Sequence, residues 1–81
     1  MRIFVLGTGA TGSYLAHLLA RQGHQVTCGD KDIDRARQFL GKKSTIPVVQ
    51  VNARNLWGIV RAARGSQLLV NASAAVFNET V

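Results

Sequence analysis

The chain has 81 residues, of which 47% are hydrophobic and 17% charged, so it is one small globular domain rather than a disordered segment. Its net charge of +6 is scattered along the chain without a nucleic-acid-reading motif, and we expect no nucleic-acid partner. Because no apolar run is long enough to span a bilayer, we expect no membrane partner. The chain has a single cysteine, which fits a reducing compartment, and we expect a cytoplasmic location.

Residues 2–6 form a continuous apolar run, which predicts a strand covered on both faces, as in a parallel sheet. The pattern then becomes helical from Ala10 to Gln22, with an apolar stripe that includes Leu18. Gly23 stands where a helix typically ends.

A second strand is expected over residues 25–29, followed by a helix from about Ile33 to Leu40. Asp32 is a plausible N-cap of this helix, Phe39 belongs to its expected apolar face, and Gly41 closes it.

Residues 48–51 predict a third strand, and residues 53–64 a third helix. We expect Val60 of this helix to point inward and Trp57 to have a packing role. A fourth strand is predicted at residues 67–71.

Strand and helix thus alternate, which indicates βαβ units. We predict an α/β fold: a Rossmann-like parallel sheet of about four strands, in the order 3-2-1-4, with flanking helices. Because a full doubly wound domain has further strands, we expect residues 1–81 to be a truncated dinucleotide-binding domain, the N-terminal fragment of a longer protein. The fourth strand would form an open edge, and we expect self-association through residues from about 68 to 81.

Residues 7–12 match the pattern G-x-G-x-x-G between a predicted strand and a predicted helix. In this context Gly7 permits the tight turn, Gly9 lets the backbone approach a pyrophosphate, and Gly12 packs the helix against the strand. The first N–H groups of the helix and its dipole would hold the phosphate charge. The competing interpretation is a turn that merely requires small residues.

Other residues of this turn can also contribute to a phosphate site. Ala10 lies at the start of the helix, and the hydroxyl groups of Thr8 and Thr11 are candidate hydrogen-bond donors. All six residues of the turn are therefore candidate cofactor ligands.

Asp30 follows the second strand, where a carboxylate can accept hydrogen bonds from the adenosine ribose and thereby select NAD. Lys31 beside it could instead meet the 2′-phosphate of NADP as a point charge. We favour NAD and keep NADP as the alternative cofactor. Both residues could also be ordinary polar residues at the end of a strand.

Loops after the third and fourth strands should face the same ligand. Asn52 could contact the adenine edge or cap the third helix, and we favour capping. Asn71 could stabilise its turn or touch the cofactor, while Ala72 and Ser73 are small enough for the cofactor to pass close to the backbone. No nucleophile, base and orienting group occur together in a recognisable pattern, so we predict no catalytic site in the fragment.

The glycine-rich turn, together with the stretch from Leu69 to Asn78, resembles the saccharopine dehydrogenase-like oxidoreductases along almost the whole chain. This resemblance implies an NAD- or NADP-dependent enzyme of amino-acid or related metabolism, whose small-molecule substrate is bound by a second domain missing here. It also implies that residues 7–12 hold the pyrophosphate, that residues 30–31 lie at the ribose, and that residues 71–73 line the path toward the nicotinamide. The sequence departs from the family at Asn52, where an acidic residue is common.

A different class of protein also fits the first 40 residues. Regulatory domains that sense nucleotides and gate potassium transport share the glycine-rich turn and the acid after the second strand, without catalysis. They usually carry a Gly-Asp pair after the third strand, where this sequence has Val51-Asn52, so we favour the dehydrogenase. A ketopantoate-reductase-like enzyme is a third alternative.

Overall fold

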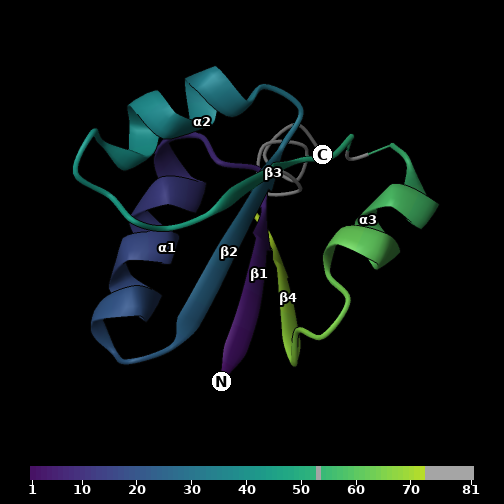
Figure 1. Ribbon diagram of the computed structural model, residues 1–81, viewed down its shortest axis with the longest axis horizontal. Coiled ribbons are helices and arrows are strands. Elements are labelled where there is room, and N and C mark those ends of the chain that lie inside the picture. The colour runs from purple at the N-terminus through teal and green to yellow at the C-terminus, as the bar shows by residue number, and fades with distance from the viewer. Residues whose placement is uncertain (53, 73–81) are drawn as a thin grey trace, which may run out of the picture.

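The computed structural model describes residues 1–52 and 54–72, which form four strands and three helices in strict alternation (Figure 1). In chain order the elements are β1 (Arg2–Leu6), α1 (Ala10–Arg21), β2 (Gln25–Asp30), α2 (Ile33–Leu40), β3 (Val48–Gln50), α3 (Leu56–Ala62) and β4 (Leu68–Asn71). The predicted alternation is therefore confirmed over the described residues.

The four strands form one parallel sheet in the order β3-β2-β1-β4. β1 lies in the interior of the sheet, where Phe4 pairs with Thr27 of β2 and with Leu69 of β4. This arrangement confirms the predicted Rossmann-like α/β fold and strand order. Because the strands are parallel, the segments that follow β1, β2, β3 and β4 all leave the sheet at the same edge.

Helices cover both faces of the sheet, with α1 and α2 on one side and α3 on the other (Figure 1). Ile3 and Val5 pack toward α1 and α2, whereas Phe4 and Leu6 pack toward Ile59 of α3. Successive residues of a strand point to opposite faces, so a strand covered on both sides must be apolar throughout. This explains the continuous apolar run at the start of the chain.

The buried face of α1 departs from the predicted apolar stripe at Leu18, whereas Leu15 and Leu19 pack against the core. Gly12, Ser13 and Ala16 are its buried residues, whereas Leu18 is exposed, so the prediction that Leu18 points inward was wrong. Small residues allow the helix axis to approach the sheet closely, and this turns the neighbouring leucine toward solvent.

Three other apolar predictions also fail. Phe39 of α2 is exposed, and the Arg35 guanidinium lies over its ring, 5.6 Å from the centroid. On α3, Val60 is exposed and Trp57 is 77% exposed, because the helix directs Ile59 toward the sheet instead. Trp57 therefore has no packing role among the described residues.

α3 is also shorter than the predicted helix over residues 53–64. Asn55 caps it by accepting a hydrogen bond from the Gly58 N–H at 3.1 Å. A Cβ atom on Gly58 would lie 3.2 Å from the Asn55 side chain. The Asn55 cap therefore leaves little room for a side chain at position 58. This explains why glycine, which weakens helices, occurs inside α3.

Candidate functional site

The glycine-rich turn lies between β1 and α1, at the edge of the sheet where the strands end. Gly7 has φ of 88°, a conformation that favours glycine, and its N–H donates to the Gly29 carbonyl at 2.8 Å. A Cβ atom on Gly12 would collide with the Gly7 carbonyl oxygen and lie 3.5 Å from Cβ of Ala72. The backbone conformation thus favours glycine at position 7, and the packing requires it at position 12.

Gly9 is different, because the space beside it is nearly empty. It is the N-cap of α1 in an extended conformation, and no side chain caps the helix. A Cβ atom there would meet one atom within 4 Å, Nη2 of Arg35 at 3.9 Å. The fold therefore gives no steric reason for glycine at this position, whereas a ligand close to the backbone would give one.

The side chains that flank Gly9 leave the helix start open. Ala10 and Thr11 are both exposed, and the first turn of α1 contains no acidic residue. An uncapped helix N-terminus presents backbone N–H groups and partial positive charge to an anion. The start of α1 is therefore a candidate anion site.

Thr8 and Asp30 join the turn to the end of β2. The Thr8 side chain is completely buried, and its N–H donates to Oδ2 of Asp30 at 2.8 Å. Its hydroxyl makes a long contact of 3.5 Å with the Gly29 carbonyl and so points into the protein. The other carboxylate oxygen of Asp30 accepts from the Asp32 N–H at 3.1 Å. One carboxylate therefore holds the glycine-rich turn and the β2–α2 loop together.

Cys28, immediately before this region, is fully buried in the core, as its place in the strand predicts. Burial raises the pKa of its thiol above the ordinary value, and the negative charge of Asp30 adds to this effect. A hydrogen bond with Thr8 acts in the opposite direction and lowers the pKa. A buried thiol with a raised pKa is a poor nucleophile, so Cys28 is a structural residue.

The end of β4 lies beside the turn. Asn71 pairs with Leu6 in register and is exposed, while Ala72 is buried and donates its N–H to the Leu6 carbonyl at 2.9 Å. The proximity of Ala72 to Gly12 brings the fourth strand and the start of α1 together, as the predicted fold requires. Ser73, the third candidate in this segment, lies outside the described residues.

Asn52 does not cap the third helix, so that prediction was wrong. Its Oδ1 accepts from the Arg54 N–H at 2.9 Å, and its carbonyl accepts from the Asn55 N–H at 2.9 Å. These bonds form a turn one step before the helix, and Asn55 is the cap. The signal was present in the sequence, because asparagine directly precedes the apolar Leu56.

Lys31 is exposed at the end of β2, and its backbone carbonyl accepts from Nε2 of Gln50 at 3.2 Å. The cation at the glycine-rich turn is a different residue, Arg35, whose place beside Gly9 was not predicted from the sequence. Its guanidinium reaches the open space beside Gly9 from the first turn of α2. The sequence did contain an indication of this position, because Arg35 follows the predicted N-cap, Asp32, by three residues.

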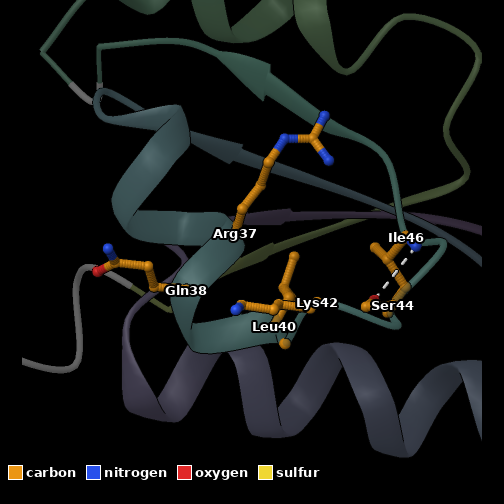
Figure 2. A pocket seen from close by; sticks show the side chains of 7 residues that line it. Arg37, Gln38, Leu40, Lys42, Ser44 and Ile46 are labelled. Atoms are coloured by element: carbon orange, nitrogen blue, oxygen red, sulfur yellow. Dashed lines mark hydrogen bonds between the residues drawn. The ribbon is translucent and has the colours of Figure 1, made fainter.

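A hollow of about 400 Å³ lies away from this site, at the C-terminal end of α2 (Figure 2). Arg37, Leu40, Lys42 and Ile46 are among its lining residues, and no residue of the glycine-rich turn lines it. It is a separate surface feature, formed where the chain leaves α2 for β3.

Two kinds of feature are absent from residues 1–52 and 54–72. No group of three or more potential metal-ligating side chains occurs in this part of the chain. Within the same residues, none of the helices has the length and apolar character needed to cross a bilayer.

Residues 3–81 match the family model described as the saccharopine dehydrogenase NADP binding domain. No curated protein matches the chain. The family match confirms the resemblance found in the sequence and supports a nicotinamide dinucleotide as the ligand. It favours NADP over NAD, which corrects the order of preference drawn from Asp30.

Proposed function

The chain belongs to the saccharopine dehydrogenase NADP binding domain family, and from this we propose that it holds the pyrophosphate of NADP on residues 7–12. The observation that carries the proposal is the empty space beside Gly9. The other two motif glycines of the turn have reasons within the fold, the positive φ of Gly7 and the packing of Gly12. A pyrophosphate close to the backbone explains why the second glycine is also needed.

In this proposal the backbone does most of the binding. N–H groups at the start of α1 donate to the phosphate oxygens, and the helix dipole adds favourable charge. Ala10 and Thr11 lie at the exposed helix start, where the Thr11 hydroxyl is available as a further donor. Thr8 contributes by fixing the turn to Asp30, since its own hydroxyl points inward.

The remaining candidates take places along the extended cofactor. We assign Asn71, Ala72 and Ser73 to the path toward the nicotinamide, because β4 ends next to the turn. We place Lys31 and Asn52 on the adenosine side, after β2 and β3. The sheet order supports this direction, since a dinucleotide crosses the sheet edge over the central strands.

When bound, the nicotinamide ring supplies hydride transfer, and the protein supplies binding and orientation. We propose that the chain is the cofactor-binding domain of an oxidoreductase whose small-molecule substrate is bound by a further domain. The described residues 1–52 and 54–72 offer a cofactor platform without an assembled acid–base pair, so the chain by itself should turn over no substrate. The family match does not favour the regulatory, potassium-transport type of domain.

Calorimetric titration of the chain with NADP, NADPH and NAD tests the binding proposal. We expect saturable binding of one dinucleotide per chain, tighter for the NADP forms. A parallel dehydrogenase assay with a panel of amino acids should detect no hydride transfer. Absence of binding to all three cofactors would refute the proposed site, and steady turnover by the chain alone would refute the inactive platform.

A further inference from the structure

The basic residues are spread along the sequence, but the fold gathers several of them around the hollow at the C-terminal end of α2. A second hollow, of about 630 Å³, adjoins the first one of about 400 Å³ and extends to the C-terminal half of α1. Both hollows are lined by Leu40, Gly41, Lys42, Ser44 and Ile46, and we call their combined surface the basic groove. No residue of the glycine-rich turn lines this groove.

The charge of the basic groove has one sign. Four of the ten lysine and arginine residues of the chain line it, namely Arg21, Arg37, Lys42 and Lys43, and all four are exposed. In the part of the chain that the structure describes, no acidic residue lines either hollow. A concave surface with charge of one sign attracts a partner of the opposite sign.

The floor of the groove is apolar. Leu40 is buried in the core between the sheet and helices α1 and α2, and Ile46 packs against the same core while remaining partly exposed. Figure 2 shows both side chains at the hollow, beside Lys42 and Ser44. A ligand that uses the whole groove therefore needs an apolar group next to negative charges.

The groove is formed before any ligand arrives. Nε2 of His17 donates to the Leu40 carbonyl at 2.8 Å and so ties α1 to the end of α2. In the loop that follows, the Ser44 N–H donates to the Gly41 carbonyl at 3.1 Å, and the Ser44 hydroxyl oxygen accepts from the Ile46 N–H at 3.3 Å. The Ser44 hydroxyl keeps its own proton to donate to an anion. Binding to such a surface requires little ordering of the backbone.

Three classes of anionic partner fit this surface poorly. No phenylalanine, tyrosine or tryptophan of the described residues lines the groove, so it offers no platform on which nucleic-acid bases stack. A bilayer is flat on this scale, whereas the groove is concave. A second copy of the chain carries the same net charge of +6, and two of its four acidic residues, Asp30 and Asp32, already accept backbone N–H groups.

We propose that the basic groove is a docking surface for an acidic segment of another protein, one that carries a large apolar side chain among its carboxylates. The apolar side chain rests on Leu40 and Ile46, the carboxylates pair with the cations of the rim, and the Ser44 hydroxyl donates to one of them. A protruding segment of this kind satisfies both the shape and the charge of the groove. The inference goes beyond the proposed function and does not depend on it.

Fluorescence anisotropy of labelled synthetic peptides measures the docking directly. The probes are short peptides in which glutamates flank a central leucine at several spacings, and two matched sets replace the glutamates with glutamine or the leucine with serine. We expect saturable binding of the glutamate–leucine peptides that weakens as salt is added. The serine set should bind about 10-fold more weakly, because the apolar contact is lost. The glutamine set should not bind detectably.

Charge reversal at Lys42 tests the location, because this residue lines both hollows. Lys42→Glu should weaken peptide binding about 10-fold, since it replaces an attraction with a repulsion. Arg61→Glu is the matched control, because it makes the same change in net charge at an exposed position of α3, and it should weaken binding less than about twofold. Equal losses in the two variants would reduce the effect to net charge and overturn the inference.

Further measurements separate the remaining partners. Amide chemical shifts in the NMR spectrum should change around residues 40–46 when the peptide binds, and saturating NADP should not displace it. Displacement by NADP would place the peptide in the cofactor site and overturn the docking surface, whereas failure of NADP to bind would refute the proposed function alone. Tighter binding of a single-stranded oligonucleotide or of phosphatidylserine vesicles at the groove would also overturn it. So would the absence of saturable binding for every glutamate–leucine peptide.

Discussion

At the scale of single residues, Gly9 and Gly12 differ in the space that surrounds them. A side chain at position 12 would collide with the Gly7 carbonyl, whereas a side chain at position 9 would extend into open space. We therefore expect Gly9→Val to abolish dinucleotide binding and leave the thermal midpoint nearly unchanged. Gly12→Val should destabilise the fold by about 1–3 kcal/mol, as overpacking typically does.

Thermal unfolding followed by circular dichroism, combined with calorimetric titration, separates the two effects. Each variant serves as the control for the other, since both add the same side chain within one turn. Unchanged affinity in Gly9→Val would mean that the turn is not the phosphate site.

Cys28 gives a pH dependence of stability. Burial raises the pKa of its thiol in the folded chain, so the contribution of the neutral thiol is complete below the pKa of the unfolded chain. That contribution is lost as the pH rises from about 8.5, the ordinary thiol value, toward the folded value. Urea unfolding at pH 7 and pH 10 should show a steeper loss for the native chain than for Cys28→Ala. Equal losses of stability in the native chain and in Cys28→Ala would show that ionisation of this thiol does not cause the pH dependence.

The sequence predicted the position of the glycine-rich turn better than the orientations of the side chains around it. The spacing of Gly7, Gly9 and Gly12 was enough to locate the turn, because each requirement is local. The direction of the Asp30 carboxylate depends on a contact with Thr8 across 22 residues, which no local pattern encodes. The same reason applies to Arg35, whose position beside Gly9 follows from the packing of α2 near the turn.

At the scale of elements, strands were predicted more reliably than the buried faces of helices. A parallel strand covered on both sides requires a continuous apolar run, so β1 could be found directly. The face of α1 was misjudged at Leu18 because periodicity ranks large apolar residues first. Because α1 lies close to the sheet, its buried positions include the small residues Gly12 and Ala16, which hydrophobicity alone does not predict.

The cap of α3 gives a prediction at this scale. Asn55→Ala removes the acceptor for the Gly58 N–H and should lower the free energy of unfolding by about 1 kcal/mol. Asn52→Ala is the matched control, because its side chain bonds the Arg54 N–H outside the helix and should cost less. Urea unfolding of both variants measures the difference. A larger loss for Asn52→Ala would show that the turn before α3, rather than its cap, fixes this helix.

At the scale of the whole molecule, β4 is an edge strand of the sheet that the described residues form. Among the described residues it pairs with β1 alone, and Leu68 and Leu69 are each 46% exposed. Unpaired backbone groups beside exposed apolar side chains tend to bind another strand. We therefore propose that the 81-residue chain self-associates through a surface that begins at Leu68, although the predicted continuation to Val81 lies largely outside the described residues.

Light scattering over a concentration series measures this association. The average mass should rise with concentration in the native chain, and Leu69→Lys should shift the rise to higher concentration by placing a charge at the contact. Trp57→Lys is a control that removes an exposed apolar group from α3 without touching the strand. A monomer that persists at high micromolar concentration would contradict the proposal.

The pairing of β1 with β4 also determines the order in which the molecule can assemble. Gln67 and Arg2 exchange hydrogen bonds across 65 residues, with the Arg2 N–H donating to Oε1 of Gln67 at 2.9 Å and the Gln67 N–H donating to the Arg2 carbonyl at 2.8 Å. The contacts of β1 with β2 close a much shorter loop, and each doubling of loop length adds about 0.6 kcal/mol of entropic cost. The first βαβ unit, which contains the glycine-rich turn and Asp30, can therefore form early, and β4 joins it last. During synthesis from the N-terminus, the unit that contains the glycine-rich turn would be complete before the fourth strand has been made.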